Sequence, residues 1–345
     1  MMHDVKPIWM LLGGSMLLLA ALAMLSSNES HVLGYRAAAM RHGGVVRNAT
    51  HSGPTAANNG EMVLVAGTPT IVKPATDRQF GIQADVPLLW RVTDMFQWRQ
   101  IEYAGSTSYE LEWVDHPVDS SVFEDSRDHR NPSQMPFGNA RYLAGEVRMD
   151  GFLLSSSIVL AMPGREDVTP DFSRLRPNLA ASFRPVDGHL LTSQDPASPQ
   201  LGDVRVSWKG APVQPVTVIA QNRNGTLVPA DGVQDGPGFQ LQVGLLQVTD
   251  LQPDLPNPPS MPWFWRVASL LLALGGSWVL MRGMPLRQSL WLPTLGLGIT
   301  LVCGLAGVMW VSARTDIGVL LIGAALLSLG ITAWQMYQRQ PPPES

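Results

Sequence analysis

Four long apolar runs stand out from a chain whose other residues are of mixed polarity. The runs cover residues 8–26, 263–281, 290–311 and 317–337. Each has about the length that an α-helix needs to cross roughly 30 Å of hydrocarbon. None contains Asp or Glu, and Arg266 is the only charged residue inside them. The pattern therefore predicts four transmembrane helices, one near the N-terminus and three near the C-terminus.

The polar block between the first two runs, residues 27–262, shows the alternation of half-buried strands. Apolar side chains fall on one face of each of three stretches, which are residues 109–113, 203–208 and 239–245. The pair Asn224-Gly225 separates two further strand-like segments and is typical of a type I′ hairpin turn. The sequence thus predicts a membrane protein with α-helical spans and a large β-rich (α+β) extramembrane domain.

Two finer features of the same block are also expected. A short helix is predicted near residues 173–184, and the domain is expected to form one body or two lobes divided near residues 162–169. A segment with five prolines, residues 251–262, is expected to connect the domain to the second run as a stiff linker without helix.

Small residues recur every four positions along each of the three C-terminal runs. They are Ser269, Ala273, Ser277, Gly296, Thr300, Gly304, Ala324, Ser328 and Thr332. Spacing of four places such residues on one helix face, where two backbones can approach closely. We expect these stripes to pack the helices of one chain together, and an interface between copies of the chain is the alternative.

Arginines in the short connections predict the orientation in the membrane. Arg282 and Arg287 lie between the second and third runs, and Arg339 follows the fourth. Short loops rich in Arg and Lys stay in the cytosol. The N-terminal residues 1–7 and the tail 338–345 are therefore expected in the cytosol, with residues 27–262 on the opposite side.

The first run is expected to be a retained membrane anchor. A signal peptide cleaved near Ala21-Leu22-Ala23 is the alternative, because small residues flank that position. An apolar run of this length exceeds the 7–15 residues of a usual signal-peptide core. We therefore prefer the anchor.

Composition removes several classes of function. The net charge is −4, and basic residues form no consecutive block, so no nucleic-acid partner is expected. The single cysteine, Cys303, lies in the third run, so the extramembrane domain has no disulfide and no cysteine metal site. The predicted spans contain no histidine or acid, which argues against a transporter or a proton channel.

One hydrophilic loop carries the residue types that could bind a metal. Its acids and histidines are Asp115, His116, Asp119, Asp125, Asp128 and His129. Their spacing matches no recognised ligand motif, so we interpret the segment as a solvated loop. The sequence therefore predicts no catalytic, cofactor-binding or metal-ligating residues, and a metal-dependent enzyme stays the less favoured alternative.

A series of segments resembles one known family. In chain order these are EMVLVAG at 61–67, LWRVTDMFQW at 89–98, YELEW at 109–113, GFLLSS at 151–156, LGDVRVS at 201–207 and VTVIAQNRNGTLVP at 216–229. Their order and spacing, together with the one-plus-three layout of spans, resemble the transmembrane protein 43 (LUMA) family. The resemblance covers nearly the whole chain, and we expect a bacterial member.

The resemblance implies an architecture more than a chemistry. Eukaryotic members are proteins of the endoplasmic reticulum and inner nuclear membrane that self-associate and act with emerin and lamins. A bacterial member would lie in the cytoplasmic membrane with a periplasmic domain and would lack those partners. We expect a non-enzymatic scaffold that binds membrane lipids, forms a homo-oligomer and organises other membrane proteins. A pore or channel subunit is the alternative.

Overall fold

The computed structural model describes residues 6–234, 236–284 and 291–338. The chain forms two compact units, one of residues 1–40 with 254–345 and one of residues 41–253. The loop that carries Arg287, the segment before residue 6 and the tail with Arg339 lie outside the described residues.

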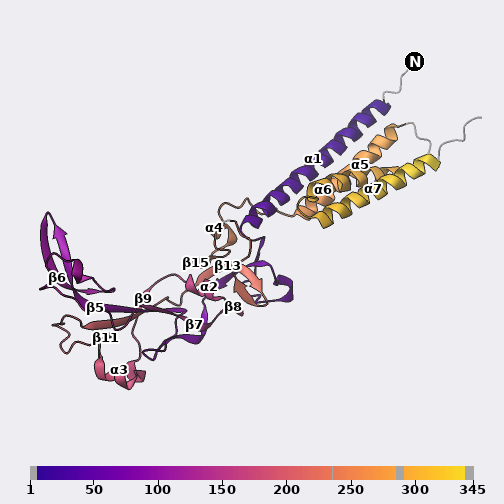
Figure 1. Cartoon of the computed structure of the whole chain (residues 1–345). Coiled ribbons are helices and arrows are strands. Elements are labelled where there is room, and N and C mark those ends of the chain that lie inside the picture. The colour runs from indigo at the N-terminus through magenta and orange to yellow at the C-terminus, as the bar shows by residue number, and fades with distance from the viewer. Residues whose placement is uncertain (1–5, 235, 285–290, 339–345) are drawn as a thin grey trace, which may run out of the picture. The chain divides into compact units, whose positions relative to one another are not determined.

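The helical unit contains four helices that are long and apolar enough to cross a membrane. They are α1 (Lys6–Arg41), α5 (Pro262–Gly283), α6 (Trp291–Trp310) and α7 (Thr315–Gln338). The three C-terminal helices lie beside α1 (Figure 1). This layout confirms the predicted one-plus-three arrangement of spans. Helix α1 also continues for about four turns beyond the apolar run that ends at residue 26.

The second unit is built mainly of strands, which confirms the predicted β-rich domain. The strands are β1 (Val46–Asn48), β2 (Met62–Gly67), β3 (Thr70–Asp77), β4 (Ile82–Ala84), β5 (Leu88–Tyr103), β6 (Ser106–Val114), β7 (Ala140–Met149), β8 (Phe152–Leu154), β9 (Glu166–Val168), β10 (Arg184–Val186), β11 (His189–Leu191), β12 (Val204–Gly210), β13 (Val216–Arg223), β14 (Thr226–Val228) and β15 (Gln240–Val243). Short helices connect them, namely η1 (Ala56–Asn58), η2 (Ser120–Val122), α2 (Ser156–Leu160), η3 (Phe172–Arg174), α3 (Pro177–Ser182) and α4 (Val248–Leu251).

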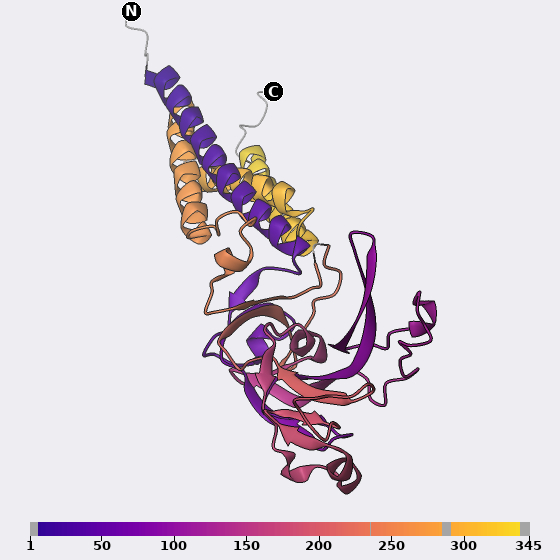
Figure 2. The same ribbon diagram turned by 90° about the vertical axis from the view of Figure 1, so that its left-hand side faces the viewer.

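These strands join into one sheet system with the main order β1-β2-β13-β14-β8-β7-β5-β12-β11-β10. The long strand β5 is its centre, because it pairs antiparallel with β12, β7 and β6. The second half of β5 and strand β6 form a hairpin whose tip extends away from the rest of the sheet (Figure 2). Strands β6 and β12 include the stretches whose alternation predicted them.

The structure contains the predicted hairpin turn and the predicted short helix, and it shows the details of both. Strands β13 and β14 pair antiparallel up to Arg223 and Thr226, with a two-residue turn between them. Asn224 and Gly225 both have positive φ, as a type I′ turn requires. The helix predicted near residues 173–184 is split into η3 and α3, because Pro177 begins a new helix at its first turn.

The apolar core of the β-rich unit consists of three clusters of buried side chains. One gathers around Phe152 and Ile158, a second around Phe80 and Trp208, and a small third around Ile219. All three lie against strands of the same connected sheet system. Trp208 is 1% exposed, whereas the other strand tryptophans of this unit are only half-buried.

A buried ion pair lies within the second cluster. Asp77, at the end of β3, is 0% exposed, and both of its carboxylate oxygens accept hydrogen bonds from Arg91 Nη1 at 3.2 and 3.0 Å. Trp208 Nε1 donates to Asp77 Oδ2 at 3.2 Å. Burial, followed by the negative charge of Asp77, raises the pKa of Tyr142 to about 12. The group therefore joins β3, β5 and β12 through polar contacts in an apolar surrounding.

Candidate functional site

Glu29 lies on the packed face of α1. The buried positions along this helix include Gly14, Leu18, Ala21 and Leu25, and Glu29 follows at the same spacing of three or four residues. That spacing keeps residues on one helix face. Glu29 is only 1% exposed. An acid therefore occupies a buried position on a helix face whose other buried residues are apolar. Such a carboxylate needs partners, because burying an unpaired charge is costly.

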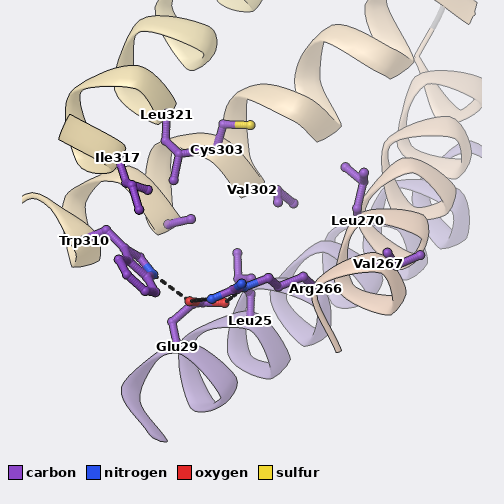
Figure 3. Close-up of a pocket in the computed structure, with 11 residues that line it drawn as sticks. Leu25, Glu29, Arg266, Val267, Leu270, Val302, Cys303, Trp310, Ile317 and Leu321 are labelled. Atoms are coloured by element: carbon purple, nitrogen blue, oxygen red, sulfur yellow. Dashed lines mark hydrogen bonds and ion pairs between the residues drawn. The ribbon is translucent and has the colours of Figure 1, made fainter. Parts of the chain in front are cut away.

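Arg266 of α5 and Trp310 of α6 supply those partners. Arg266 Nε donates to Glu29 Oε1 at 2.7 Å and Arg266 Nη2 donates to Glu29 Oε2 at 2.8 Å, which is a bidentate pair. Trp310 Nε1 donates to Glu29 Oε2 at 2.6 Å. The guanidinium also lies 5.5 Å from the centre of the Trp310 ring. We call these three residues the clamp, since they join α1, α5 and α6 (Figure 3).

The clamp lies near the ends of the apolar runs of α1, α5 and α6. Arg266 comes four residues after the start of α5, which is about 6 Å along the helix. Trp310 is the last residue of α6, and Glu29 follows closely on the first apolar run. Along the chain, Glu29 and Arg266 lie on the parts of α1 and α5 nearest the extramembrane domain, whereas Trp310 precedes the short connection to α7. Arg and Trp are common at membrane–water interfaces.

An apolar cavity of about 380 Å³ opens next to the clamp. Besides the clamp, its walls include Val267 and Leu270 of α5, Val302 and Cys303 of α6, and Leu321 of α7. Figure 3 shows these side chains around the space, with the Glu29 carboxylate and the Arg266 guanidinium meeting at one border of it. We call this space the membrane cavity. It has one charged end and apolar walls from four helices.

The predicted stripe on α5 is fully buried. Ser269, Ala273 and Ser277 are each 0% exposed. The neighbouring Gly276 lies so close to α1 that a Cβ atom there would be 2.9 Å from the backbone nitrogen of Leu18. Ala273 belongs to an apolar cluster with Leu18 and Ala21. This stripe is therefore in contact with α1 of the same chain.

The predicted stripes of α6 and α7 face each other. Ser328 Oγ donates to the carbonyl of Gly296 at 3.1 Å, and Thr300 Oγ1 donates to the carbonyl of Ala325 at 3.4 Å. A Cβ atom at Gly296 would collide with Thr332 Oγ1, and one at Gly304 would lie 3.8 Å from Ala325 Cβ. Ala324 is half-buried. These two stripes are therefore in contact with each other inside one chain.

The acidic loop between β6 and β7 does not assemble a metal site. Within residues 6–234, 236–284 and 291–338, no three His, Cys, Asp or Glu side chains converge in the geometry of a metal site. Asp115 bonds His116, and Asp119 accepts from the backbone nitrogen of Ser121, as at the start of a helix. The hydrogen bond from the Ser121 hydroxyl, followed by the one from its backbone nitrogen, lowers the pKa of Asp119. His129 stacks on Tyr109 with ring centres 3.8 Å apart.

The same loop is tied to β5 by amide side chains. Gln97 donates to the carbonyl of His116 at 3.0 Å and accepts from the backbone nitrogen of Val118 at 3.0 Å. Asn131 accepts from the backbone nitrogen of Trp98 at 2.8 Å and donates to its carbonyl at 2.9 Å. These contacts tie the loop to a part of β5 that also pairs with β6. The loop is a structural element fixed by hydrogen bonds, with most of its acids turned to solvent.

The sequence pattern identified Arg266 as the charged residue of the apolar runs, but it predicted an environment for Arg266 that differs from the one in the structure. A lone arginine at the end of an apolar run is expected to reach lipid headgroups beside Trp263 and Trp265. The structure instead directs Arg266 to Glu29, because α1 continues as a helix past residue 26 and brings an acid opposite it. The spacing of Leu18, Ala21 and Leu25, extended by four residues, was the signal that could have identified Glu29.

The architecture and this site define the class to which the protein belongs. The chain is an integral membrane protein with several apolar helices and one β-rich domain. The sequence profile of the family described as Transmembrane protein 43 matches residues 99–330. The chain therefore belongs to the transmembrane protein 43 family.

Individual relatives agree with that assignment. Transmembrane protein 43 of Homo sapiens is 27% identical over 194 residues, which cover 50% of this chain and 48% of the relative. The match in Mus musculus is 27% identical over 202 residues, with the same coverage. The Drosophila melanogaster homolog is 24% identical over 311 residues, covering 81% of this chain and 80% of the relative. The chain thus spans about half the length of the mammalian relatives it matches, and no solved structure matches it.

Proposed function

We propose that the chain is a non-enzymatic membrane scaffold that self-associates and organises lipids or partner proteins around it. Membership of the transmembrane protein 43 family supports a membrane protein of that kind. The observation that carries self-association is an exposed stripe on α7, made of Leu320, Gly323, Leu327, Gly330 and Trp334. These residues recur at three and four positions, the spacing of a helix–helix seam.

The α7 stripe has the shape that close helix packing in a membrane uses. Leu320, Leu327 and Trp334 are 70%, 67% and 60% exposed. Gly323 and Gly330 have no atom within 4 Å of the position that a Cβ would occupy. Small residues between large ones let a second helix approach closely in lipid. The other glycines of α6 and α7 are buried or half-buried inside the chain, so this stripe is the surface for a second copy.

The α7 stripe is tested by measuring particle mass in lipid nanodiscs. The unmodified chain is expected to give a defined oligomer by mass photometry. The double substitution Gly323→Leu/Gly330→Leu should shift the population to monomers, because two leucines hold the helices apart. Gly13→Leu and Gly275→Leu are matched controls, since both glycines also face open space, and they should leave the mass unchanged. A monomeric parent chain, or an oligomer that tolerates the α7 change, would contradict the proposal.

The proposal includes an orientation with both termini in the cytosol and the β-rich domain outside it. The support is Arg282 at the end of α5, on the side of the membrane opposite to the ends that lead into the domain. In a Cys303→Ala background, a cysteine at the exposed Ser198 should react with an impermeant maleimide from outside sealed cells. A cysteine at Met284, directly after α5, should react only after the membrane is opened. The reverse pattern would overturn this orientation.

A further inference from the structure

We propose that the membrane cavity binds an acyl chain of an anionic phospholipid and that Arg36 and Arg266 hold its phosphate. This assigns a ligand to a space within one chain, so it does not depend on the self-association proposed above. Three features carry it: the position of the cavity along the helices, the charge at its polar end, and its size.

The cavity has the polarity profile of a lipid. Its charged end is the clamp, at the ends of the apolar runs. Its apolar walls lie deeper in the spans, because Leu270 is one turn further along α5 than Arg266, and Cys303 is seven residues before Trp310, about 10 Å along α6. A molecule that fills this space therefore needs an apolar tail of at least that length and a polar group at the interface. A membrane phospholipid supplies both.

The charge at the polar end favours an anion. The guanidinium carbons of Arg36 and Arg266 lie 5.6 and 5.5 Å from the centre of the Trp310 ring. Glu29 neutralises only one of them, and among the described residues no carboxylate forms an ion pair with Arg36. Arg36 is seven residues after Glu29, so it lies on the same face of α1. The clamp region thus carries one uncompensated positive charge.

Arg266 also retains hydrogen-bonding capacity. Glu29 accepts from its Nε and Nη2, which leaves Nη1 for another acceptor, and the Arg266 side chain is 42% exposed. A guanidinium that keeps donors free beside an apolar space is suited to phosphate, because charge-assisted hydrogen bonds to phosphate oxygens are strong. The cavity volume of about 380 Å³ is within the roughly 300–1,000 Å³ of ligand pockets.

The test uses the full chain in detergent and two readouts. Native mass spectrometry during titration with phosphatidylglycerol or phosphatidylcholine should show one bound phosphatidylglycerol, held at least tenfold more tightly than phosphatidylcholine. Cys303 lies in the cavity wall and is the only cysteine of the chain, so its reaction rate with N-ethylmaleimide reports occupancy. Phosphatidylglycerol should slow this reaction at least fivefold, whereas free inorganic phosphate should not slow it.

Arg36→Gln removes the uncompensated charge and leaves the clamp in place. It should reduce the preference for phosphatidylglycerol about tenfold. Arg314→Gln is the matched control, since Arg314 follows α6 closely but is already paired with Asp316, and it should bind like the parent chain. Equal affinity for the two lipids, equal effects of the two substitutions, or an unprotected Cys303 with lipid bound would each overturn the proposal.

Discussion

Replacing Asp77 with alanine is expected to remove about 3–5 kcal/mol from the stability of the β-rich unit. Asp77 is 0% exposed and the Arg91 side chain is 6% exposed, so the substitution leaves a guanidinium buried without its counter-ion. It also leaves the Trp208 indole N–H without its acceptor. A typical domain has only about 5–15 kcal/mol of stability in total. Chemical denaturation of the full chain, with hydrogen exchange followed in β5 and β12, measures the loss.

Asp94→Ala is the matched control for this change. Asp94 is on β5, the strand that carries Arg91, and it pairs with Arg205 of β12, with Nη2 to Oδ2 at 2.9 Å. The side chains of Asp94 and Arg205 are 13% and 34% exposed. Solvent screens such a pair, so its loss should cost about 1 kcal/mol or less. If the two substitutions lower the stability of the β-rich unit equally, the buried Asp77–Arg91 pair does not stabilise the unit more than a partly exposed pair does.

Alternation along the sequence was sufficient to predict β6 and β12 because their polarity follows the faces of the sheet. Strand β5 shows where that rule stops. Its buried positions include Arg91, Thr93 and Gln97, which a pattern of apolar residues would assign to solvent. Their partners are far along the chain: Asp77 for Arg91, and the backbone of the loop after β6 for Gln97. Such pairs become visible only when the sheet order is known.

The sheet order itself was not accessible from local pattern. Strand β3 pairs with β7, and β12 pairs with β5 across more than one hundred residues of chain. The hairpin of β13 and β14 could be predicted because both strands and their turn are neighbours in sequence. A contact between neighbours in sequence can be predicted from the residues of that segment alone. The pairing of distant strands depends on how the apolar faces of all strands are buried together.

The candidate site was missed for a related reason. Hydropathy ends the first span near residue 26, since the polar residues 27–31 follow, among them Asn28 and Glu29. Backbone helicity does not end there, because tertiary packing against α5 and α6 continues to support α1. An unpaired Arg266 in the second run was itself a sign that a counter-ion should be sought, as charges within spans are usually paired.

Replacing Glu29 with alanine is expected to destabilise the helical unit by about 2–3 kcal/mol. Breaking a buried pair costs about 3–5 kcal/mol, and the 42% exposure of Arg266 reduces that value because water and headgroups can solvate part of its charge. Trp310 also loses its acceptor, so α6 is no longer tied to α1 at this end. The free energy of unfolding in mixed micelles of lipid-like detergent and dodecyl sulfate, followed by circular dichroism, measures the effect.

Two further variants decide whether this loss comes from the clamp. Asp316→Ala breaks an ion pair near the same helix ends whose side chains are 46% and 64% exposed, and it should leave the unfolding curve almost unchanged. Glu29→Ala/Arg266→Ala removes both charges and should cost less than the sum of the single changes, since neither charge is left unpaired. Strictly additive losses, or a loss for Asp316→Ala as large as that for Glu29→Ala, would show that the clamp does not hold α1 against α5 and α6. The expected non-additivity would show that the charged end of the membrane cavity also fixes the helices that form its walls.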